Sequence, residues 1–293
     1  MGGGYIGLEM AEALIMRGID VSLIDMLPQV MGTLDADMAS LVSDALDRAG
    51  VALYLEEPLK EFDVNGDRVT AVITAKRSLA ADIVILGMGV RPNTILAGAA
   101  GIPLGEKGSI KVTDRLKTHM EGVWAVGDCV ESTHLVSKKP FYVALGTVAN
   151  KQGRVAGVNI GGGDARFPGV AGTAVAKVFD TEIARTGLQE RELRDLGVQY
   201  VSTRIQDYTR SHYYPEAGKI TVKMYAEKRT GRLLGTQIVG MPGSAKRIDV
   251  IATALHAGLT VEEMVNLDLG YAPPFSPAWD PIHIAARQAL KQL

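Results

Sequence analysis

The glycine-rich start of the chain is the feature that most constrains its fold. Gly2, Gly4 and Gly7 fit the G-x-G-x-x-G pattern of a dinucleotide-binding turn. In that pattern the first glycine permits a tight turn, the second lets the backbone approach a pyrophosphate, and the third lets a helix pack closely on a strand. Residues 8–17 follow with apolar side chains at helical spacing, and Gly18 ends the predicted helix. The N-terminal amides of this helix would face a diphosphate.

An acidic residue ends the strand that is predicted next, over residues 21–24. Asp25 stands there, 18 residues after Gly7. A carboxylate at this place can accept hydrogen bonds from a ribose diol and would repel a 2′-phosphate, so the sequence favours NADH over NADPH. The pattern also requires a strand before the glycines, whereas the chain begins at Met1. We therefore expect a βαβ unit without its first strand, in a chain that is part of a larger protein.

Composition excludes several classes of protein. The chain has 293 residues, enough for two domains, and a formal net charge of -2 without a long basic run, which argues against nucleic acid as a partner. No apolar stretch reaches the ~18 residues of a membrane span, and no signal peptide precedes the first motif. A single cysteine, Cys129, excludes an internal disulfide framework and suits a reducing compartment. We expect a cytoplasmic protein that contacts no membrane.

The rest of the chain reads as an α/β region followed by an α+β region from about residue 167. A hairpin is expected over residues 58–75 with its turn at Asn65-Gly66, because Asn-Gly favours two-residue turns. The other predicted strands cover residues 51–55, 82–86, 110–112, 123–128, 173–179, 200–206, 219–225 and 233–239, and the other predicted helices cover residues 38–49, 143–156, 244–256 and 280–290.

Six segments carry a resemblance to a known family. In order they are GGGYIGLEMAE, LGMGVRPNT, VWAVGDCVE, VALGTVANKQGR, FDTEIARTGL and LGYAPPFSPAWDPIHIAA. They resemble the two-dinucleotide-fold flavoenzymes of the pyridine nucleotide–disulfide oxidoreductase family, and within it the single-cysteine branch of coenzyme A-disulfide or persulfide reductases and NADH oxidases. The resemblance covers essentially the whole chain. It also implies that the family's N-terminal FAD segment, with the cysteine that faces the flavin, is absent from this sequence.

The resemblance implies three domains. They are a Rossmann-like NAD(P)-binding domain without its first strand at residues 1–89, the C-terminal part of an FAD-binding domain at residues 90–163, and an α+β dimerisation domain with an antiparallel sheet at residues 164–293. The implied cofactors are FAD and NADH, and the implied assembly is a homodimer. The residues expected at the cofactors are Gly2, Gly4, Tyr5, Ile6, Gly7, Glu9, Asp25, Gly89, Thr118, Gly127, Asp128, Ala144, Leu145 and Thr147.

In the family, the aspartate of the Gly-Asp motif contacts the ribityl hydroxyls of FAD. Gly127-Asp128, with Thr118 upstream, matches that motif, so Asp128 is the expected flavin contact. The alternative is a turn aspartate that caps backbone amides. The helix that begins near Ala144 would point its positive N-terminus at the flavin and stabilise the negative charge of the reduced ring.

Tyr213 and Tyr271 resemble the paired tyrosines of coenzyme A-disulfide reductases, which reach across the dimer toward the partner's cysteine, and are the expected catalytic residues. A phenol with a pKa of about 10 could protonate a departing thiolate while it stays mostly neutral. The alternative is a tyrosine packed at a subunit interface with its hydroxyl paired. Asn150 and Trp279 are carried over as residues that border the substrate.

Other reactive side chains are assigned structural roles. Cys129 follows a predicted buried strand and is expected to fill space there. The His-Pro-Thr segment of two-cysteine disulfide reductases is missing, and His283 is expected to be structural. Lys246 and Arg247 could contact phosphates of coenzyme A or could belong to a solvated helix face. The histidines lack metal-ligand spacing, so no metal site is expected.

The function implied by the resemblance is that of a flavin-dependent NAD(P)H oxidoreductase. The substrate would be a small molecule, a coenzyme A disulfide or persulfide. Two alternatives stay open. One is an NADH oxidase or peroxidase, which would pass electrons to oxygen or peroxide. The other is a non-catalytic remnant that binds a nucleotide and dimerises.

Overall fold

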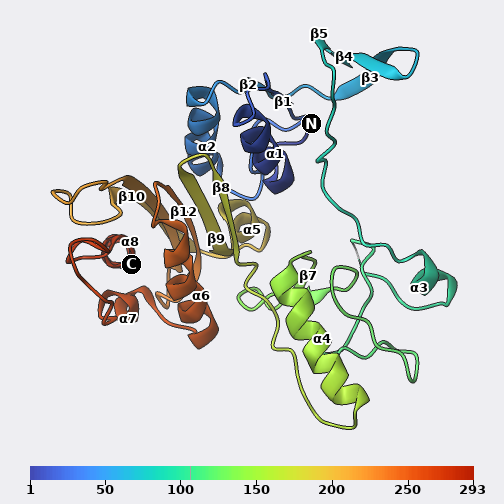
Figure 1. The fold of residues 1–293 in the computed structure, drawn as a ribbon. Helices are drawn as coiled ribbons and strands as arrows, with labels where there is room; N and C mark the ends of the chain where they lie inside the picture. The colour runs from blue at the N-terminus through green and yellow to red at the C-terminus, as the bar shows by residue number, and fades with distance from the viewer. Residues whose placement is uncertain (106) are drawn as a thin grey trace. The chain divides into compact units, whose positions relative to one another are not determined.

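The computed structural model describes residues 1–105 and 107–293 and divides into two compact units (Figure 1). The first unit consists of residues 1–89 together with residues 173–293, and the second consists of residues 90–172. The two ends of the chain therefore fold together, although more than 80 residues of the second unit separate them in the sequence.

The N-terminal part of the first unit contains a short βαβ arrangement. Strand β1 (Ser22–Ile24) pairs in parallel with β2 (Ala52–Tyr54), and helix α2 (Ala36–Arg48) connects them. Helix α1 (Tyr5–Ile15) precedes β1 and begins directly after the glycine turn, with Gly4 as its N-cap. These four elements confirm the predicted order of helices and strands. The buried side chains of α2 recur every three or four residues, as an amphipathic helix requires.

The predicted hairpin forms, but its two-residue turn is Gly66-Asp67, one position after the expected Asn65-Gly66. Strands β3 (Leu59–Asn65) and β4 (Arg68–Thr74) are antiparallel, and β5 (Ser78–Ala80) adds a third strand. Asn65 pairs with Arg68, so two residues form the turn, and Gly66 adopts a positive φ of 62° that favours glycine.

The strand predicted over residues 82–86 is wrong. No strand is assigned to this segment. The Met1 ammonium donates to the Ile85 carbonyl at 2.6 Å, and Gly87 N, just after the segment, donates to the Met1 carbonyl at 2.8 Å. A strand needs a ladder of paired residues, and apolar composition alone does not supply one. Ile83 and Leu86 consequently remain exposed.

The C-terminal part of the first unit is built on a five-stranded sheet in which every pairing is antiparallel, as predicted. The strand order is β10-β11-β12-β9-β8. The strands are β8 (Ala174–Val178), β9 (Thr181–Gly187), β10 (Tyr200–Tyr208), β11 (Lys219–Glu227) and β12 (Leu233–Gly240). No strand was predicted over β9, although β9 lies within the segment FDTEIARTGL that carries part of the family resemblance.

Short helices cover this sheet. Helix α6 (Ile248–Ala257) packs on β12 and β9, and α8 (Pro281–Leu290) packs on β10 and β11. Helix α8 begins where Asp280 accepts a hydrogen bond from Ile282 N at 2.9 Å. The remaining elements are α5 (Glu190–Asp195), the 3₁₀ helix η1 (Ala245–Arg247) and α7 (Val261–Val265).

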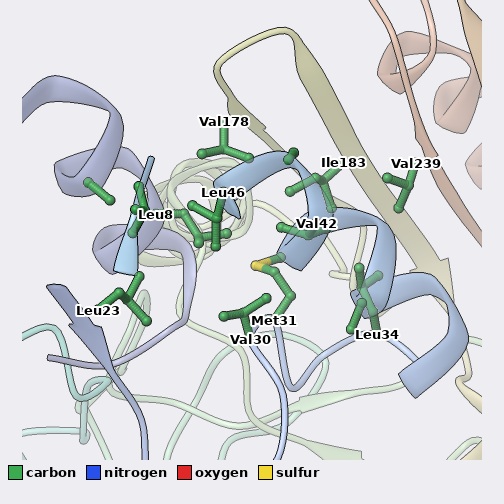
Figure 2. Packing of buried hydrophobic residues seen from close by; sticks show 14 of the residues in the cluster. Leu8, Leu23, Val30, Met31, Leu34, Val42, Leu46, Val178, Ile183 and Val239 are labelled. Carbon is green, nitrogen blue, oxygen red and sulfur yellow. The ribbon is translucent and has the colours of Figure 1, made fainter. Parts of the chain in front are cut away.

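One hydrophobic core joins the N-terminal helices to the antiparallel sheet (Figure 2). Leu8 of α1 and Leu46 of α2 are fully buried in the same cluster as Val178, Ile183 and Val239 of the sheet. Helix α1 packs on β8, and α2 packs on β8, β9 and β12. The glycine turn, which leads into α1, is thus supported by a core to which both ends of the chain contribute residues.

A buried polar cluster joins the same two regions, and we call it the Asp35 cluster. It consists of Asp35, Glu190, Lys223, Tyr225 and Gln237. The Asp35 carboxylate accepts hydrogen bonds from Gln237 Nε2 at 2.7 Å and from the Tyr225 hydroxyl. Lys223 Nζ lies 3.2 Å from Asp35 and 3.6 Å from the Glu190 carboxylate.

The second unit has little regular structure. It contains α3 (Ile95–Ala99), β6 (Ser132–Thr133), β7 (Pro140–Phe141) and α4 (Gly146–Ile160). The strands predicted over residues 110–112 and 123–128 are wrong, since the described residues form isolated bridges there instead. Ile110 N donates to the Cys129 carbonyl at 2.8 Å, and Thr118 N donates to the Val123 carbonyl at 3.0 Å, but the bridges do not extend into ladders.

None of the described helices combines the length and the apolar composition that crossing a lipid bilayer would take.

The buried phenol of Tyr225 gives a testable pH dependence. Burial raises its pKa above the ordinary value of 10.0, and the hydrogen bond to Asp35 raises it further. Because the pKa in the folded protein exceeds that of the unfolded chain, this stabilisation is complete below about pH 10 and is lost as the pH rises above it. We expect the stability advantage of the wild type over Tyr225→Phe to shrink by about 1.4 kcal/mol per pH unit above about pH 10. Urea unfolding of both proteins measures it, and an advantage that does not change with pH would contradict it.

Candidate functional site

The glycine turn lies between β1 and residues 85–87 of the first unit. Gly2 N donates to the Ile24 carbonyl at the end of β1, at 2.8 Å, and Gly87 N donates to the Met1 carbonyl on the other side. The turn then leads into α1 at Gly4. The first amides of α1 have no carbonyl within the helix to bond, so they can donate to an anion.

The three glycines of the motif are required for different reasons. Gly2 has a φ of +96°, and a Cβ there would lie 2.4 Å from the Gly87 oxygen. A Cβ at Gly7 would lie 1.8 Å from the Gly2 oxygen. A Cβ at Gly4 would meet no described atom within 4 Å. The fold itself therefore requires the first and third glycines, whereas the second faces open space.

Asp25 fixes the glycine turn and keeps the capacity to bind a ligand. Its Oδ2 accepts from Gly3 N at 2.6 Å, and its Oδ1 accepts from Leu27 N at 2.8 Å. Each carboxylate oxygen has a second lone pair that can accept a ribose hydroxyl. Burial lowers the pKa of the Met1 ammonium, and the charge of Asp25 opposes that shift.

The other residues expected at the dinucleotide are Tyr5, Ile6 and Glu9 of α1 and Gly89. The Tyr5 hydroxyl lies 3.4 Å from Thr33 Oγ1, while Ile6 and Glu9 are exposed on α1. Gly89 has a φ of +87°, and a Cβ there would meet no described atom within 4 Å. The structure thus brings Tyr5, Ile6 and Glu9 onto the helix that starts at the turn.

In the second unit, the Gly127-Asp128 turn is held by a buried glutamine that sequence analysis missed. Gly127 N donates to Gln152 Oε1 at 2.8 Å, and Gln152 Nε2 donates to Ser132 Oγ at 2.9 Å. Gln152 is 1% exposed. Its spacing from Val155 and Ala156, which are buried on the same face of α4, was the signal that could have revealed it.

The Asp128 side chain is exposed, and no hydrogen bond to its carboxylate is found among the described residues. Its backbone carbonyl accepts from the Tyr142 hydroxyl at 2.9 Å. The alternative role, a carboxylate that caps backbone amides, has no such bond in the described chain. The carboxylate is therefore open to a ligand with hydroxyl donors.

The neighbouring expected residues have separate roles. Thr118 is buried, and its hydroxyl accepts from Met120 N at 3.2 Å and donates to the Val123 carbonyl at 3.0 Å. The half-buried residues Ala144 and Leu145 lead into α4, where Thr147 is exposed in the first turn. The start of α4 is thus open for an anionic or electron-rich group.

Cys129 has the character of a structural thiol. Burial raises its pKa above the ordinary value, and the charge of Asp128 adds to that rise. A thiol with a raised pKa is protonated at neutral pH and is a weak nucleophile. The environment of Cys129 therefore does not activate it.

Tyr213 and Tyr271 lie on two exposed loops of the first unit that the partly buried Arg247 holds. The two side chains are 67% and 54% exposed. Arg247 donates to the Thr209 carbonyl at 2.7 Å, to the Phe275 carbonyl at 3.2 Å and to Asp280 Oδ2 at 2.9 Å. Its guanidinium is therefore engaged within the protein, which disfavours a phosphate contact. Lys246 is paired with Asp249.

The residues expected at the substrate lie in different units. Trp279, in the first unit, stacks edge-on against His283 with ring centroids 5.9 Å apart and lies under Arg287. The buried ring of His283 bonds the Leu267 carbonyl through Nε2 at 2.9 Å. Asn150, in the second unit, donates to the Gly146 carbonyl within α4. Among the described residues no group of three or more His, Cys, Asp or Glu side chains could hold a metal ion.

Comparison with known proteins decides the family. The model of the pyridine nucleotide-disulphide oxidoreductase family matches residues 1–153, and the model of the dimerisation domain of that family matches residues 173–281. The chain belongs to this family. The resemblance found in the sequence and the predicted fold class are thereby confirmed.

Individual oxidoreductases of this family are similar along nearly the whole chain. The NAD(P)H sulfur oxidoreductase (CoA-dependent) of Pyrococcus furiosus is 40% identical over 98% of this chain and 64% of its own length. The NADH oxidase of Methanocaldococcus jannaschii is 39% identical over 100% of this chain and 65% of its own. The solved structure of a NAD-dependent persulfide reductase from A. fulgidus is 42% identical, with a TM-score of 0.96 over 99% of this chain and 54% of that one. The chain spans just under two thirds of the curated relatives.

Alanine substitutions at Gly4 and Gly7 are expected to change stability by different amounts. Gly4→Ala places a methyl group in open space at an ordinary φ of -84°, so we expect its unfolding free energy to stay within about 0.5 kcal/mol of the wild type. Gly7→Ala drives a Cβ into the Gly2 carbonyl, and we expect a loss of about 3 kcal/mol or more. Denaturant unfolding compares them, and equal losses in the two variants would contradict this difference.

Proposed function

We propose that the protein is a flavin-dependent NAD(P)H oxidoreductase that reduces a coenzyme A-linked disulfide or persulfide and acts in the cytoplasm as a homodimer. The observation that carries this proposal is the glycine turn, where the fold requires Gly2 and Gly7 but leaves the space at Gly4 free beside the Asp25 carboxylate. That combination suits the pyrophosphate and ribose of a dinucleotide.

The preference for NADH rests on Asp25. Its charge would repel the 2′-phosphate of NADPH, and the next two residues, Met26 and Leu27, supply no compensating cation. The names of the similar proteins from Pyrococcus furiosus and A. fulgidus, which specify NAD(P)H and NAD, support a pyridine nucleotide. Tyr5, Ile6, Glu9 and Gly89 complete the proposed dinucleotide site.

FAD is the second proposed cofactor, and when bound it would supply two-electron transfer between the nicotinamide and a disulfide. Asp128 would hold its ribityl hydroxyls, since this carboxylate is exposed and its turn is fixed by Gln152. The open N-terminus of α4, at Leu145 and Thr147, would stabilise negative charge on the ring. Gly127, Thr118 and Ala144 shape the backbone on either side.

Tyr213 and Tyr271 are the proposed proton donors to a departing coenzyme A thiolate. Both phenols are exposed and sit on loops that Arg247 fixes, so they can reach a substrate or a second protomer. The match to the family's dimerisation domain supports an active site completed by two copies of the chain. Trp279 and Asn150 are proposed to border the substrate.

An NADH oxidase is the second candidate, because the similar protein of Methanocaldococcus jannaschii carries that name. The two candidates differ in the electron acceptor, which would be coenzyme A disulfide or persulfide in one and oxygen or peroxide in the other. Their proposed cofactor sites are the same.

Asp25 variants test the nucleotide preference. We expect Asp25→Ala to weaken NADH binding by about tenfold, because a charge-assisted hydrogen bond to the ribose is lost. The ratio of the affinities for NADH and NADPH should fall as well. Because the two oxygens of Asp25 also hold Gly3 N and Leu27 N, both variants loosen the turn, but Asp25→Asn retains one acceptor oxygen and loosens it less. Urea unfolding of both variants measures that damage. Calorimetric titration with both nucleotides measures the effect. Unchanged NADH affinity in Asp25→Ala would remove the ribose role.

Steady-state turnover with different acceptors tests the reaction. We expect NADH-dependent reduction of coenzyme A disulfide to exceed that of oxygen and peroxide, and Tyr271→Phe to lower kcat with the disulfide by about 100-fold without changing NADH affinity. Faster turnover with oxygen would favour the NADH oxidase. Purified protein that is colourless and inactive with every acceptor would favour a non-catalytic remnant.

A further inference from the structure

Asp35 stands at a helix N-cap but does not cap the helix. An N-cap aspartate ordinarily accepts hydrogen bonds from amides of the first helical turn. Among the described residues, the Asp35 carboxylate makes no such bond with α2. Its Oδ2 accepts instead from Gln237 Nε2 and Tyr225, its Oδ1 accepts from Glu190 N at 3.1 Å, and its own amide donates to Gln237 Oε1 at 2.9 Å. The carboxylate and the amide of Asp35 thus bond the antiparallel sheet and α5, while its carbonyl accepts from Met38 N and Ala39 N of α2.

The partners of Asp35 are themselves buried. Tyr225 and Lys223 come from β11, and Gln237 comes from β12, with exposed fractions of 0%, 7% and 2%. Buried hydrogen bonds and ion pairs of this kind resist rearrangement, because a separated member would lose its partner away from water. The sheet therefore fixes the position of Asp35.

The segment between Asp25 and Asp35 leads from the sheet back to the glycine turn. It has no helix or strand of its own, and Met31 adopts a positive φ of 46°. Met31 N donates to the Gly3 carbonyl at 2.7 Å, and the Asp25 carboxylate accepts from Gly3 N at 2.6 Å. Both backbone polar groups of Gly3, the central residue of the turn, are thus held by this segment.

We propose that Asp35, fixed by Lys223, Tyr225 and Gln237, is a positioning residue for the dinucleotide. The sheet holds Asp35, Asp35 anchors the 25–35 segment, and that segment holds Gly3 and the amides that face the pyrophosphate. Such a site must keep its geometry to within about 0.5 Å, so a loosened anchor weakens binding without touching the ligand. The inference rests on the proposed binding of NADH at the glycine turn.

Substitutions on the far side of the cluster test the proposal. Gln237→Met removes both hydrogen bonds to Asp35 at similar side-chain length, and Tyr225→Phe removes one bond. Ile238→Val is the matched control, since Ile238 is a buried apolar neighbour on β12 whose side chain points to the other face of the sheet. The measurements on the 293-residue protein are calorimetric titration with NADH and hydrogen exchange of residues 1–8.

We expect Gln237→Met to weaken NADH binding by about tenfold and Tyr225→Phe by about threefold, with faster exchange of residues 1–8 in the same order. Ile238→Val should bind NADH within about twofold of the wild type and leave that exchange unchanged, although it also removes buried atoms from the sheet. If Gln237→Met does not fold, Tyr225→Phe, which loses a single bond, decides the question.

The experiment distinguishes failure of the positioning role of Asp35 from failure of the proposed NADH binding. Wild-type affinity and unchanged exchange in the cluster variants would overturn the positioning role while leaving NADH binding intact. An equal loss of affinity in Ile238→Val would also overturn it, because the effect would then reflect general stability. If the wild type does not bind NADH, the proposed function fails, and the exchange of residues 1–8 by itself decides whether the cluster holds the turn.

Discussion

The packing of the N-terminal helices against the antiparallel sheet is the interaction on which the first unit depends. Strands β1 and β2 have three residues each and cannot by themselves bury the apolar faces of two helices. Those faces are covered by β8, β9 and β12, so that Leu8 and Val178, or Val42 and Ile183, share one core. The glycine turn is therefore held in place by residues from the opposite end of the chain.

Electrostatics reinforces that packing at Lys223. A buried ammonium is costly unless it is paired and hydrogen-bonded. Burial alone would lower the pKa of Lys223, but the hydrogen bond to Asp37 and the charges of Asp35 and Asp37 outweigh it and raise the pKa. Because an apolar contact tolerates sliding and a hydrogen-bonded charge pair does not, the Asp35 cluster fixes the register between helix and sheet more narrowly than the core alone.

In each candidate site, exposed side chains that could contact a ligand lie on turns or loops that less exposed polar side chains hold in position. Asp128 is exposed, and the buried Gln152 holds its turn. Tyr213 and Tyr271 are exposed, and the partly buried Arg247 bonds the backbone of both of their loops. This arrangement is expected physically, since a ligand needs access whereas its binding groups need fixed positions. The supporting residues are polar side chains on helices, which sequence patterns ordinarily assign to the surface.

Much of this protein was determined by local sequence. Glycine spacing, helical periodicity and the Asn-Gly turn predicted α1, α2 and the hairpin, because each depends on residues close together in the chain. The strands expected over residues 82–86 and 123–128 failed, because an apolar run does not reveal whether a neighbour exists to pair with it. The link between Asp35 and Gln237, which are 202 positions apart, and the difference between Gly4 and Gly7 were decided only by tertiary structure. Both depend on which atoms meet after folding, and those contacts join residues that no local pattern relates.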